Sequence, residues 1–449
     1  MKSTSLQEIS HLLKITAHYN VRIEGVAVDS RLIRPGDLFF ALPGAKVDGH
    51  AFLAQAAANG AAAAVVHTAY AGSDFGLPLL RSEDVLESLQ LLAKTLLQKG
   101  KAQVVAVTGS LGKTSTKGFI SQILSKKFKV STSPGNSNSQ IGLPLSIINH
   151  FREDDEILIL EMGMTEAGQI ARLVEIAPPT IAVVTLVALV HACYFESIED
   201  IARAKAEIFS HPATKLGIYH FDSNLSELLS GTGSCPKISF STFNDSADFF
   251  LKSDAVKTQI RCSEKQSSKQ HSGAPFSLIG EQTHHNFLAA AVVAAHLGMS
   301  WDEILDCIPS LALPERRLET IEKYGATFIN DAYNAAELSM KAALKSLPTP
   351  KANCKRIAVF GGIVELGKYS KACHRSVGEH ALKCVDLMLC FGEECKEIRD
   401  CWEEAGRQVV WAPERSEIVK ALKDNLQPGD VVLLKGSRSK NVCKVLEEL

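Results

Sequence analysis

The chain has 449 residues, a formal net charge of −2 and an aromatic content of 6%. A chain of this length exceeds a single hydrophobic core, so we expect about three domains. The balanced charge argues against a nucleic-acid partner, the few aromatic residues argue against base stacking, and no apolar run approaches the roughly 20 residues that span a bilayer.

The N-terminus and the cysteines both bear on the compartment. Residues 1–20 contain no continuous apolar core, so we expect no signal peptide. Eleven scattered cysteines without a CxxC pair favour reduced thiols and a cytoplasmic protein. Cys384, Cys390, Cys395 and Cys401 cluster loosely, but their long spacings favour ordinary semi-buried cysteines over a zinc site.

Residues 1–85 alternate short strand and helix patterns. Apolar runs at 38–42 and 63–66 predict strands, and the alanine-rich stretch 51–59 between them predicts a helix. These elements form a small α/β unit, and a helical segment at 82–99 leads into the next one.

Residues 86–313 show continuous apolar runs, each followed by a helical pattern. This alternation predicts a parallel sheet covered on both faces. The polar stretch 263–272 predicts a loop between sheet elements, and the alanine-rich stretch 286–297 predicts a closely packed helix. The predicted strands are 104–107, 157–160 and 181–184.

Residues 314–449 alternate strands and helices again, which predicts an open α/β sheet. Ligands of such sheets bind at the carboxyl ends of the strands, so polar residues that follow a strand are candidates for function. The predicted strands here are 327–329, 357–360, 385–390, 409–411 and 431–434.

The stretch 104–115 is the most informative of the chain. A buried strand, a turn bracketed by glycines and a helix beginning with Lys-Thr form the layout of a phosphate-binding loop. Lys113 would reach the outer phosphates, and the Thr114 hydroxyl would bind Mg²⁺. A helix start without a ligand is the alternative, but the flanking strand and helix favour a nucleotide site. The residues expected to hold the phosphates are Thr108, Gly109, Ser110, Gly112, Lys113, Thr114 and Ser115.

Three further polar residues lie near the same strand ends. Glu161 directly follows a strand, where a carboxylate suits Mg²⁺. His191 follows the strand expected at 181–187, and Lys205 adjoins the buried face of a helical segment. A surface turn, a structural histidine and a lysine that extends to solvent along the protein surface are the alternatives.

Other polar segments have both a binding and a structural interpretation. Asn136 and Asn138 lie in a loop that could hold a sugar or a phosphate, or could be a simple turn. Asp331 follows a strand and could bind a ribose or form an Asx turn. Arg316-Arg317 and the segment 435–438 could face an anionic substrate or be solvated charges.

Together these segments resemble the Mur ligases, the ATP-dependent amide-forming enzymes of peptidoglycan synthesis. The resemblance runs from about residue 29 to the C-terminus. Its motifs are DSR at 29–31, PGDLFFA at 35–41, DGH at 48–50, TGSLGKT at 108–114, GNSNSQIGLPL at 135–145, EMGM at 161–164, His191, AKAEIF at 204–209, DAYNA at 331–335, ELG at 365–367 and KGSR at 435–438.

The resemblance implies an α/β protein of three domains. A small N-terminal α/β domain, 1–85, would bind the UDP end of a substrate through Ser30, Arg31, Asp48, Gly49 and His50. A central P-loop ATPase-type parallel sheet, 86–313, would bind ATP. A C-terminal Rossmann-like domain, 314–449, would close over the site and bring the amine.

The resemblance also implies ATP and two Mg²⁺ ions. Glu161 and His191 match metal ligands, and Lys205 matches a carbamylated lysine, whose anionic carbamate binds a cation that an ammonium would repel. The implied metal ligands are therefore Thr114, Glu161, His191 and Lys205, and the implied catalytic residues are Lys113, Lys205 and His191. Asn286, Arg317 and Asp331 match nucleotide contacts, and Asn136 and Asn138 are assigned to the substrate.

Within the family, the DAYNA, ELG and KGSR motifs resemble the members that add D-alanyl-D-alanine to UDP-N-acetylmuramoyl-tripeptide. The expected reaction phosphorylates a carboxylate with ATP, and the amine then displaces phosphate from the acyl phosphate. The expected partners are these two small molecules, with no nucleic acid and no membrane span, and we expect a monomer.

Several positions depart from the family pattern. They leave open a nucleotide-binding member with an altered substrate or without catalysis. A folate-polyglutamating ligase fits less well, because the N-terminal block would have no role. The departures are Leu186 for Asn, Gln282-Thr283 for His-Asn, Arg316 for Gly, Ala336 for Asn, Glu337 for Pro and Gly362 for Asp.

Overall fold

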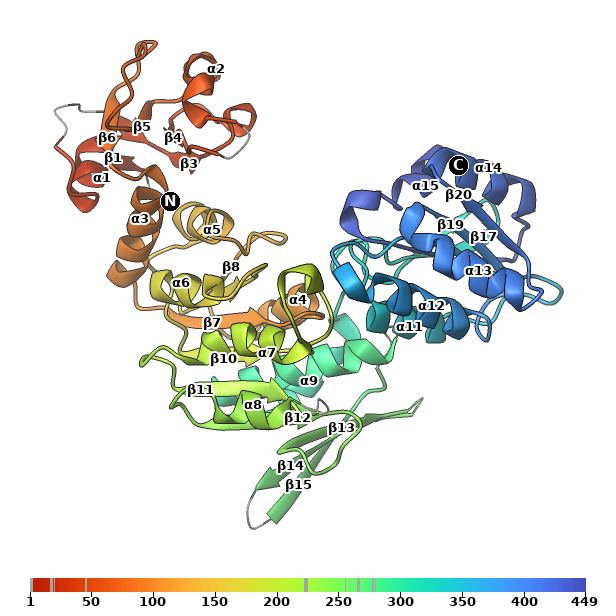
Figure 1. Cartoon of the computed structure of the whole chain (residues 1–449). Coiled ribbons are helices and arrows are strands. Elements are labelled where there is room, and N and C mark those ends of the chain that lie inside the picture. The colour runs from red at the N-terminus through yellow and green to blue at the C-terminus, as the bar shows by residue number, and fades with distance from the viewer. Residues whose placement is uncertain are drawn as a thin grey trace.

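The computed structural model describes residues 3–16, 19, 21–44, 47–221, 225–254, 256–264, 267–276, 278 and 280–449. Three α/β units follow one another along the chain, each built on its own main sheet (Figure 1). The predicted three-part α/β architecture is thereby confirmed. No helix in the described ranges is both long and apolar enough to cross a membrane.

The N-terminal unit contains a four-stranded parallel sheet in the order β3-β4-β5-β6. The predicted strands at 38–42 and 63–66 are present as β4 and β5. The predicted helix at 51–59 is a 3₁₀ turn, Gly49–Phe52, followed by α2. The elements are β1 (Thr4–Ser5), α1 (Leu6–Leu12), β2 (Arg22–Ile23), β3 (Gly25–Ala27), β4 (Asp37–Phe40), α2 (Leu53–Ala58), β5 (Ala63–His67) and β6 (Leu79–Ser82).

The central unit contains a nine-stranded sheet in the order β15-β14-β13-β12-β11-β10-β7-β9-β8, parallel from β8 to β13. Its strands are β7 (Gln103–Thr108), β8 (Val130–Thr132), β9 (Ile157–Glu161), β10 (Ile181–Val184), β11 (Leu216–His220), β12 (Lys237–Ser241), β13 (Phe249–Ser253), β14 (Thr258–Glu264) and β15 (Ser267–Gly273). Its helices are α3 (Val85–Lys99), α4 (Lys113–Leu124), α5 (Gly142–His150), α6 (Gln169–Ile176), α7 (Ile198–Ala206), α8 (Ser226–Gly231), α9 (Glu281–His296) and α10 (Trp301–Leu305).

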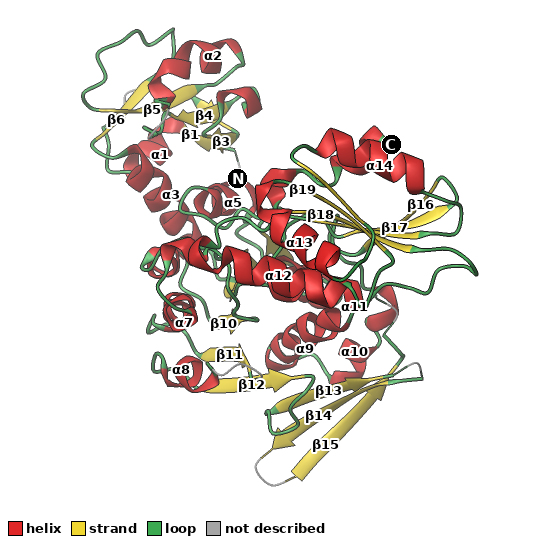
Figure 2. Cartoon of the chain, turned by 45° about the vertical axis from the view of Figure 1, so that its right-hand side comes forward, coloured by secondary structure: helices red, strands yellow, loops and turns green. Residues whose placement is uncertain are grey.

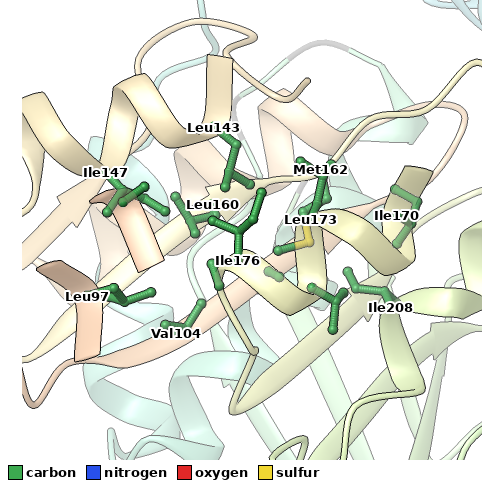
Figure 3. Close-up of a cluster of buried hydrophobic side chains, with 14 of the residues drawn as sticks. Leu97, Val104, Leu143, Ile147, Leu160, Met162, Ile170, Leu173, Ile176 and Ile208 are labelled. Carbon is green, nitrogen blue, oxygen red and sulfur yellow. The ribbon is translucent and has the colours of Figure 1, made fainter. Parts of the chain in front are cut away.

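Helices cover both faces of the inner central strands, which explains their uninterrupted apolar sequences. On one face, α3, α5 and α6 pack on β7 and β9 through Leu97, Val104, Leu143, Ile147, Leu160 and Leu173 (Figure 3). On the other face, α4 and α9 pack on Val105, Val107 and Ile159. Burial of each such large aliphatic side chain contributes about 1.5–3 kcal/mol, so the strand ends are held on a rigid base.

Two predictions for the central unit are wrong in detail. The polar stretch 263–272 is not a loop where the structure describes it, because residues 263–264 and 267–272 belong to two antiparallel strands in which Ile260 pairs with His271. β14 buries Ile260 and Cys262 in the core beside α9 and α10, and β15, which has no apolar side chain, pairs with β14 and stacks His271 on Trp301 of α10. For β10, the predicted bounds 181–184 are confirmed and the longer bounds 181–187 are wrong.

The C-terminal unit contains a six-stranded sheet in the order β16-β17-β21-β18-β19-β20, parallel except for the β16–β17 pair. Helices α11, α12 and α13 cover one face, and α14 and α15 cover the other (Figure 2). The elements are β16 (Glu319–Lys323), β17 (Ala326–Asn330), α11 (Glu337–Lys345), β18 (Arg356–Gly361), α12 (Ser370–Ala381), β19 (Leu387–Phe391), α13 (Lys396–Glu404), β20 (Val409–Ala412), α14 (Arg415–Asn425), β21 (Val431–Lys435) and α15 (Lys444–Glu448).

Candidate active site

Three neighbouring parallel strands of the central sheet end at one edge. Val107 of β7 pairs with Glu161 of β9, and Thr108 of β7 pairs with Val184 of β10. Glu161 is thus the last residue of its strand, whereas the sequence had indicated that it follows the strand. Because ligands of α/β sheets bind beyond the carboxyl ends of strands, this edge is the candidate site.

The loop between β7 and α4 requires glycine at two positions. Gly109 and Gly112 have φ values of 143° and 85°, which L-residues rarely adopt. A Cβ atom on Gly109 would lie 1.9 Å from Thr185 Oγ1, and one on Gly112 would lie 2.3 Å from Asn286 Oδ1. The loop therefore closes tightly at the N-terminus of α4, where backbone N–H groups favour an anion.

The segment that follows β10 supports this loop mainly through its backbone. The carbonyl of Leu186 accepts hydrogen bonds from the amides of Ser110 (2.8 Å) and Leu111 (3.2 Å). The Ser110 hydroxyl donates to the carbonyl of Ala188 at 2.8 Å. Since position 186 acts through its carbonyl, the departure from Asn at this position leaves the support of the loop intact.

Lys113 begins α4 and folds back over the loop. Its Nζ donates to the carbonyls of Gly109 (2.7 Å) and Ser110 (3.3 Å). Burial lowers the pKa of Lys113, and the nearby carboxylate of Glu161 opposes that shift. A lysine held only by loop carbonyls can turn outward to a phosphate, which is the role predicted for it.

Glu161 accepts two side-chain hydrogen bonds at the strand edge. Thr114 Oγ1 donates to its Oε2 at 2.8 Å, and Asn138 Nδ2 donates to its Oε1 at 2.7 Å. Among the described residues, no group of three or more His, Cys, Asp or Glu side chains is placed to hold a metal ion. One hydroxyl and one carboxylate beside a phosphate loop nevertheless fit Mg²⁺, which usually keeps waters and binds few protein ligands together with substrate phosphates.

Lys205 projects from α7 and is 3% exposed. It lines the same cavity as Lys113 and Glu161, so it does not extend to solvent. Burial, and then the charge of Lys113, lower the pKa of Lys205 well below its ordinary value. Within the described ranges no residue forms a hydrogen bond or an ion pair with its amine.

His191 precedes the 3₁₀ turn Ala192–Tyr194 and has a left-handed backbone with φ 59°. Its Nδ1 forms a hydrogen bond with Glu365 of the C-terminal unit. Burial lowers the pKa of His191, and the Glu365 carboxylate opposes that shift.

A cavity of about 700 Å³ unites most of the predicted site residues. Thr108 is fully buried beneath the loop, and Ser115 lines an adjoining cavity. The predicted residues that line the first cavity are Gly109, Ser110, Gly112, Lys113, Thr114, Asn136, Asn138, Glu161, His191, Lys205 and Arg317.

The adjoining cavity, of about 670 Å³, lies between the central and C-terminal units and shares Gly112 and Arg317 with the first. Asn286 and Asp331, both predicted nucleotide contacts, line it. In the described part of the chain, Arg317 Nε and Gln282 Oε1 are buried without a hydrogen-bond partner. Such groups are costly unless a ligand pairs with them, so this cavity suits a polar ligand such as a nucleoside.

Contacts within the C-terminal unit hold Asp331 and Arg317 at the wall of this second cavity. Asp331 accepts hydrogen bonds from the buried Lys435 ammonium and from the amide of Leu318 (3.2 Å). The Arg317 guanidinium lies 4.1 Å from the ring centre of Tyr333. Lys435, which could have faced an anion or solvent, is therefore paired with Asp331.

The residues predicted to bind the UDP end lie in the N-terminal unit and line neither cavity. Ser30 donates to Gln55 Oε1 at 2.7 Å, and Arg31 pairs with Asp29. Asp48 caps the turn that starts at Gly49 and contacts the His50 ring, which stacks on Tyr70 at 5.0 Å. The structure therefore places these residues in the N-terminal unit, outside the cavity that the phosphate loop lines.

Sequence reasoning missed one buried lysine near the site. Lys117 donates to the carbonyls of Ser133 (2.5 Å) and Gly135 (2.7 Å), just before the loop that carries Asn136 and Asn138. Its position one helical turn after Lys113, on the same face of α4, was the available signal.

Three family models match the chain: the Mur ligase family catalytic domain at 22–89, the Mur ligase middle domain at 107–294 and the Mur ligase glutamate ligase domain at 316–438. A UDP-N-acetylmuramoyl-tripeptide–D-alanyl-D-alanine ligase of Bacillus subtilis (strain 168) is 31% identical over 95% of this chain and 93% of its own. The chain belongs to the Mur ligase family. The predicted resemblance is thereby confirmed.

Other relatives match this Mur ligase over 95–100% of its length. The ligase of the same name from Escherichia coli (strain K12) is 31% identical over 100% of this chain and 99% of its own. A MurF ligase of Thermotoga maritima, solved in complex with ADP, has a TM-score of 0.79 at 30% identity and covers 95% of this chain and 96% of its own. A MurF of Acinetobacter baumannii has a TM-score of 0.86 at 25% identity and covers 100% of this chain and 99% of its own.

One predicted departure of this Mur ligase from the family pattern has a backbone conformation that favours glycine. Arg316 stands where glycine is usual and still adopts a left-handed φ of 58°. A non-glycine residue in this conformation costs about 1–2 kcal/mol, so the surrounding structure enforces it. The connection into the C-terminal unit therefore retains a glycine-like path.

Proposed function

We propose that this Mur ligase joins D-alanyl-D-alanine to UDP-N-acetylmuramoyl-tripeptide while ATP is converted to ADP and phosphate. One observation carries the proposal: Lys113, Thr114, Glu161, His191 and Lys205 share a cavity that adjoins a second one of nucleoside size. Relatives named for this reaction match nearly the whole chain at 31% identity.

The nucleotide is proposed to span both cavities. Its phosphates would accept hydrogen bonds from loop amides at the N-terminus of α4, and Lys113 would leave the loop carbonyls for the outer phosphates. Its base and ribose would occupy the second cavity beside Asn286 and Asp331. Arg317 borders both cavities and would contact the nucleotide from the C-terminal unit.

Mg²⁺ bound here would neutralise the charge that develops during phosphoryl transfer. Thr114 and Glu161 would hold one ion, and Glu161, His191 and Lys205 a second. Lys205 fits a cation only after carbamylation, because its ammonium would repel the metal. The lowered pKa favours the neutral amine, whose nitrogen adds to CO₂ and loses a proton to give an anionic carbamate.

The reaction would proceed in two displacements. A carboxylate oxygen of the tripeptide attacks the γ-phosphorus, ADP leaves, and an acyl phosphate forms. The neutral dipeptide amine then attacks the acyl carbon, phosphate leaves, and the nitrogen loses a proton. Lys113 would stabilise the transferring phosphoryl group, and approach of the C-terminal unit would exclude water from the intermediate.

The remaining assignments complete the proposal. Ser30, Arg31, Asp48, Gly49 and His50 would bind the UDP end, and Asn136 and Asn138 would face the peptide end. We keep 1–85, 86–313 and 314–449 as domain boundaries, supported by family matches at 22–89, 107–294 and 316–438. A cytoplasmic location stays a prediction, supported by eleven described free cysteines, and the monomer stays a prediction as well.

The test is phosphate release by the purified protein with ATP, Mg²⁺, UDP-MurNAc-tripeptide and D-alanyl-D-alanine. Product formation with this pair, and none when either substrate is exchanged for that of another Mur ligase, supports the proposal. Lys113→Ala and Lys205→Ala should each abolish turnover, and added bicarbonate should raise the wild-type rate only. ATP binding without turnover under all these conditions would instead establish the alternative of a family member that has lost catalysis.

A further inference from the structure

The loop that follows β10 contacts the loop that follows β18, across the boundary between the central and C-terminal units. His191 pairs with Glu365 through Nδ1, and the amide of Cys193 donates to the Glu365 carbonyl at 3.0 Å. Lys368 Nζ and Tyr369 Oη both donate to the carbonyl of Glu196, at 3.1 and 3.0 Å. The two loops therefore meet through both backbone and side chains.

The backbone at this contact is held in an unfavourable conformation on both sides. His191 and Glu365 are left-handed, with φ values of 59° and 63°, although neither is glycine. Gly367 has a φ of 55°, and a Cβ atom there would lie 3.1 Å from Cys193 Cα, so both the backbone and the close approach of the loops favour glycine at this position. Strain of this kind persists only where surrounding contacts enforce it, and it concentrates at functional sites.

Stability alone does not explain the pair. The side chains of His191 and Glu365 are 31% and 40% exposed, and ion pairs this accessible contribute little to folding. Both residues also line the cavity that holds Glu161 and Lys205. The pair therefore lies beside the proposed metal ligands.

The hydrogen bond with Glu365 gives the two imidazole nitrogens of His191 different roles. Nδ1 is occupied by Glu365, which leaves Nε2 as the nitrogen available to a ligand. Metal-binding histidines almost always donate their second N–H to a carboxylate or a carbonyl, which fixes the ring and strengthens the ligand. In this chain that carboxylate comes from a different unit than the histidine.

We propose that Glu365 is a positioning residue that directs His191 Nε2 toward the divalent cation, so that docking of the C-terminal unit completes the metal site. The inference rests on the proposed function, in which His191 binds a metal. Because coupling between two binding events is reciprocal, the cation in turn favours the docked arrangement of the two units. Metal affinity and domain position are thus linked through one hydrogen bond.

The test measures Mn²⁺ binding to the protein with ADP, by the loss of the free-ion signal in electron paramagnetic resonance, so no turnover is needed. Glu365→Ala should weaken the affected Mn²⁺ site by about tenfold or more. Glu365→Gln should restore part of the affinity, since its amide oxygen still accepts from Nδ1–H. The matched control is Glu166→Gln, which removes an exposed carboxylate near the cavity that forms no described hydrogen bond.

A double-mutant cycle separates this inference from the proposed function. His191→Ala should weaken the same site, and adding Glu365→Ala to it should have no further effect. Weakening by His191→Ala with no effect of Glu365→Ala would overturn the inference alone. No effect of either variant would overturn both the inference and the metal role of His191.

Kinetics and small-angle scattering give a second readout. Glu365→Ala should raise the KM for Mg²⁺ while kcat at saturating Mg²⁺ stays near the wild-type value. It should also abolish any compaction that Mn²⁺ causes in wild-type protein with ADP. A fall in kcat with an unchanged KM for Mg²⁺ would contradict the inference, because Glu365 would then act in the chemistry and not on the metal.

Discussion

Three lysines, Lys113, Lys117 and Lys205, lie in or beside the cavity that Glu161 and Glu365 line. Burial lowers the pKa of each, and Glu161 opposes the shift for Lys113 and Lys117. Glu161 and Glu365 line the cavity, and Glu365 already pairs with His191, so the carboxylates do not neutralise all three cations. An excess of positive charge is stable there when a polyanion such as a nucleotide triphosphate binds, or when one lysine becomes an anion.

Lys117 should act on the substrate loop more than on the nucleotide. Lys117→Met keeps the length of the side chain but leaves the carbonyls of Ser133 and Gly135 without their donor. Ser133 is buried, and an unpaired buried carbonyl costs about 1–3 kcal/mol, so the loop with Asn136 and Asn138 should lose its fixed position. We expect a rise in KM for the tripeptide substrate that exceeds any rise in KM for ATP. Equal rises would contradict this role.

His285 should make the ligand-free protein sensitive to acid. Burial first, and then His220 and His284, lower its pKa to about 3. The unfolded chain, with an ordinary histidine pKa of about 6.5, binds more protons between these values, so stability falls as the pH drops through this window, by at most about 1.4 kcal/mol per pH unit.

Calorimetry of a variant checks this pH dependence. His285→Gln should lose less of its unfolding temperature between about pH 7 and pH 5 than the wild type does. His11→Gln, at an exposed histidine, is the control and should follow the wild type. If the unfolding temperatures of all three proteins fall in parallel, groups other than His285 set the acid sensitivity.

At the scale of elements, the phosphate loop depends on β10 as much as on β7 and α4. Gly109→Ala would place a Cβ atom on Thr185 Oγ1, so the loop should open and nucleotide binding should be lost. Gly118→Ala lies in the middle of α4, where a Cβ atom would make ordinary contacts at 3.7 Å or more.

The matched glycine variants are compared by equilibrium binding of ADP and by thermal unfolding. Gly118→Ala should bind like the wild type and gain about 0.5–1 kcal/mol, because alanine favours the helix. Wild-type affinity in Gly109→Ala would show that the loop tolerates a shift of β10 and would remove the requirement for glycine.

The sequence predicts elements well where burial and function coincide. Strands β7, β9 and β21 are apolar on both faces, and the polar residues of the site follow or end them. Strand β15 escaped prediction because its sequence, SSKQHSG, has no apolar residue and its pairing with β14 joins it to the sheet. The His191–Glu365 contact also escaped, because it joins residues 174 positions apart and depends on how two units meet. No local sequence pattern predicts a contact between residues so far apart in the chain.

At the scale of the whole molecule, a nucleotide should bring the central and C-terminal units into one body. Arg317 and Asp331 come from one unit and Gly112 and Asn286 from the other, yet all four line the second cavity. The connection between the units contains the exposed Arg316, a site for trypsin. Binding of ADP with Mg²⁺ should therefore slow cleavage at this connection.

Limited proteolysis tests whether the nucleotide holds the central and C-terminal units together. The protective effect of ADP should disappear in Asp331→Ala, which removes the partner of Lys435 and one wall of the cavity. Cleavage in the N-terminal unit serves as the internal control, because that unit lines neither cavity. Unchanged cleavage at Arg316 with saturating ADP would mean that the nucleotide contacts the central unit alone.

The polar hairpin has a consequence for how the molecule behaves in a crowded solution. β15 is the outermost strand of the nine-stranded sheet, and its sequence SSKQHSG contains no apolar residue. An exposed sheet edge is a template on which a second chain can add a strand, and hydrophobic edges promote aggregation in this way. The polar composition that prevented the prediction of β15 thus disfavours the pairing of this edge of the sheet with a second chain, and so disfavours self-association.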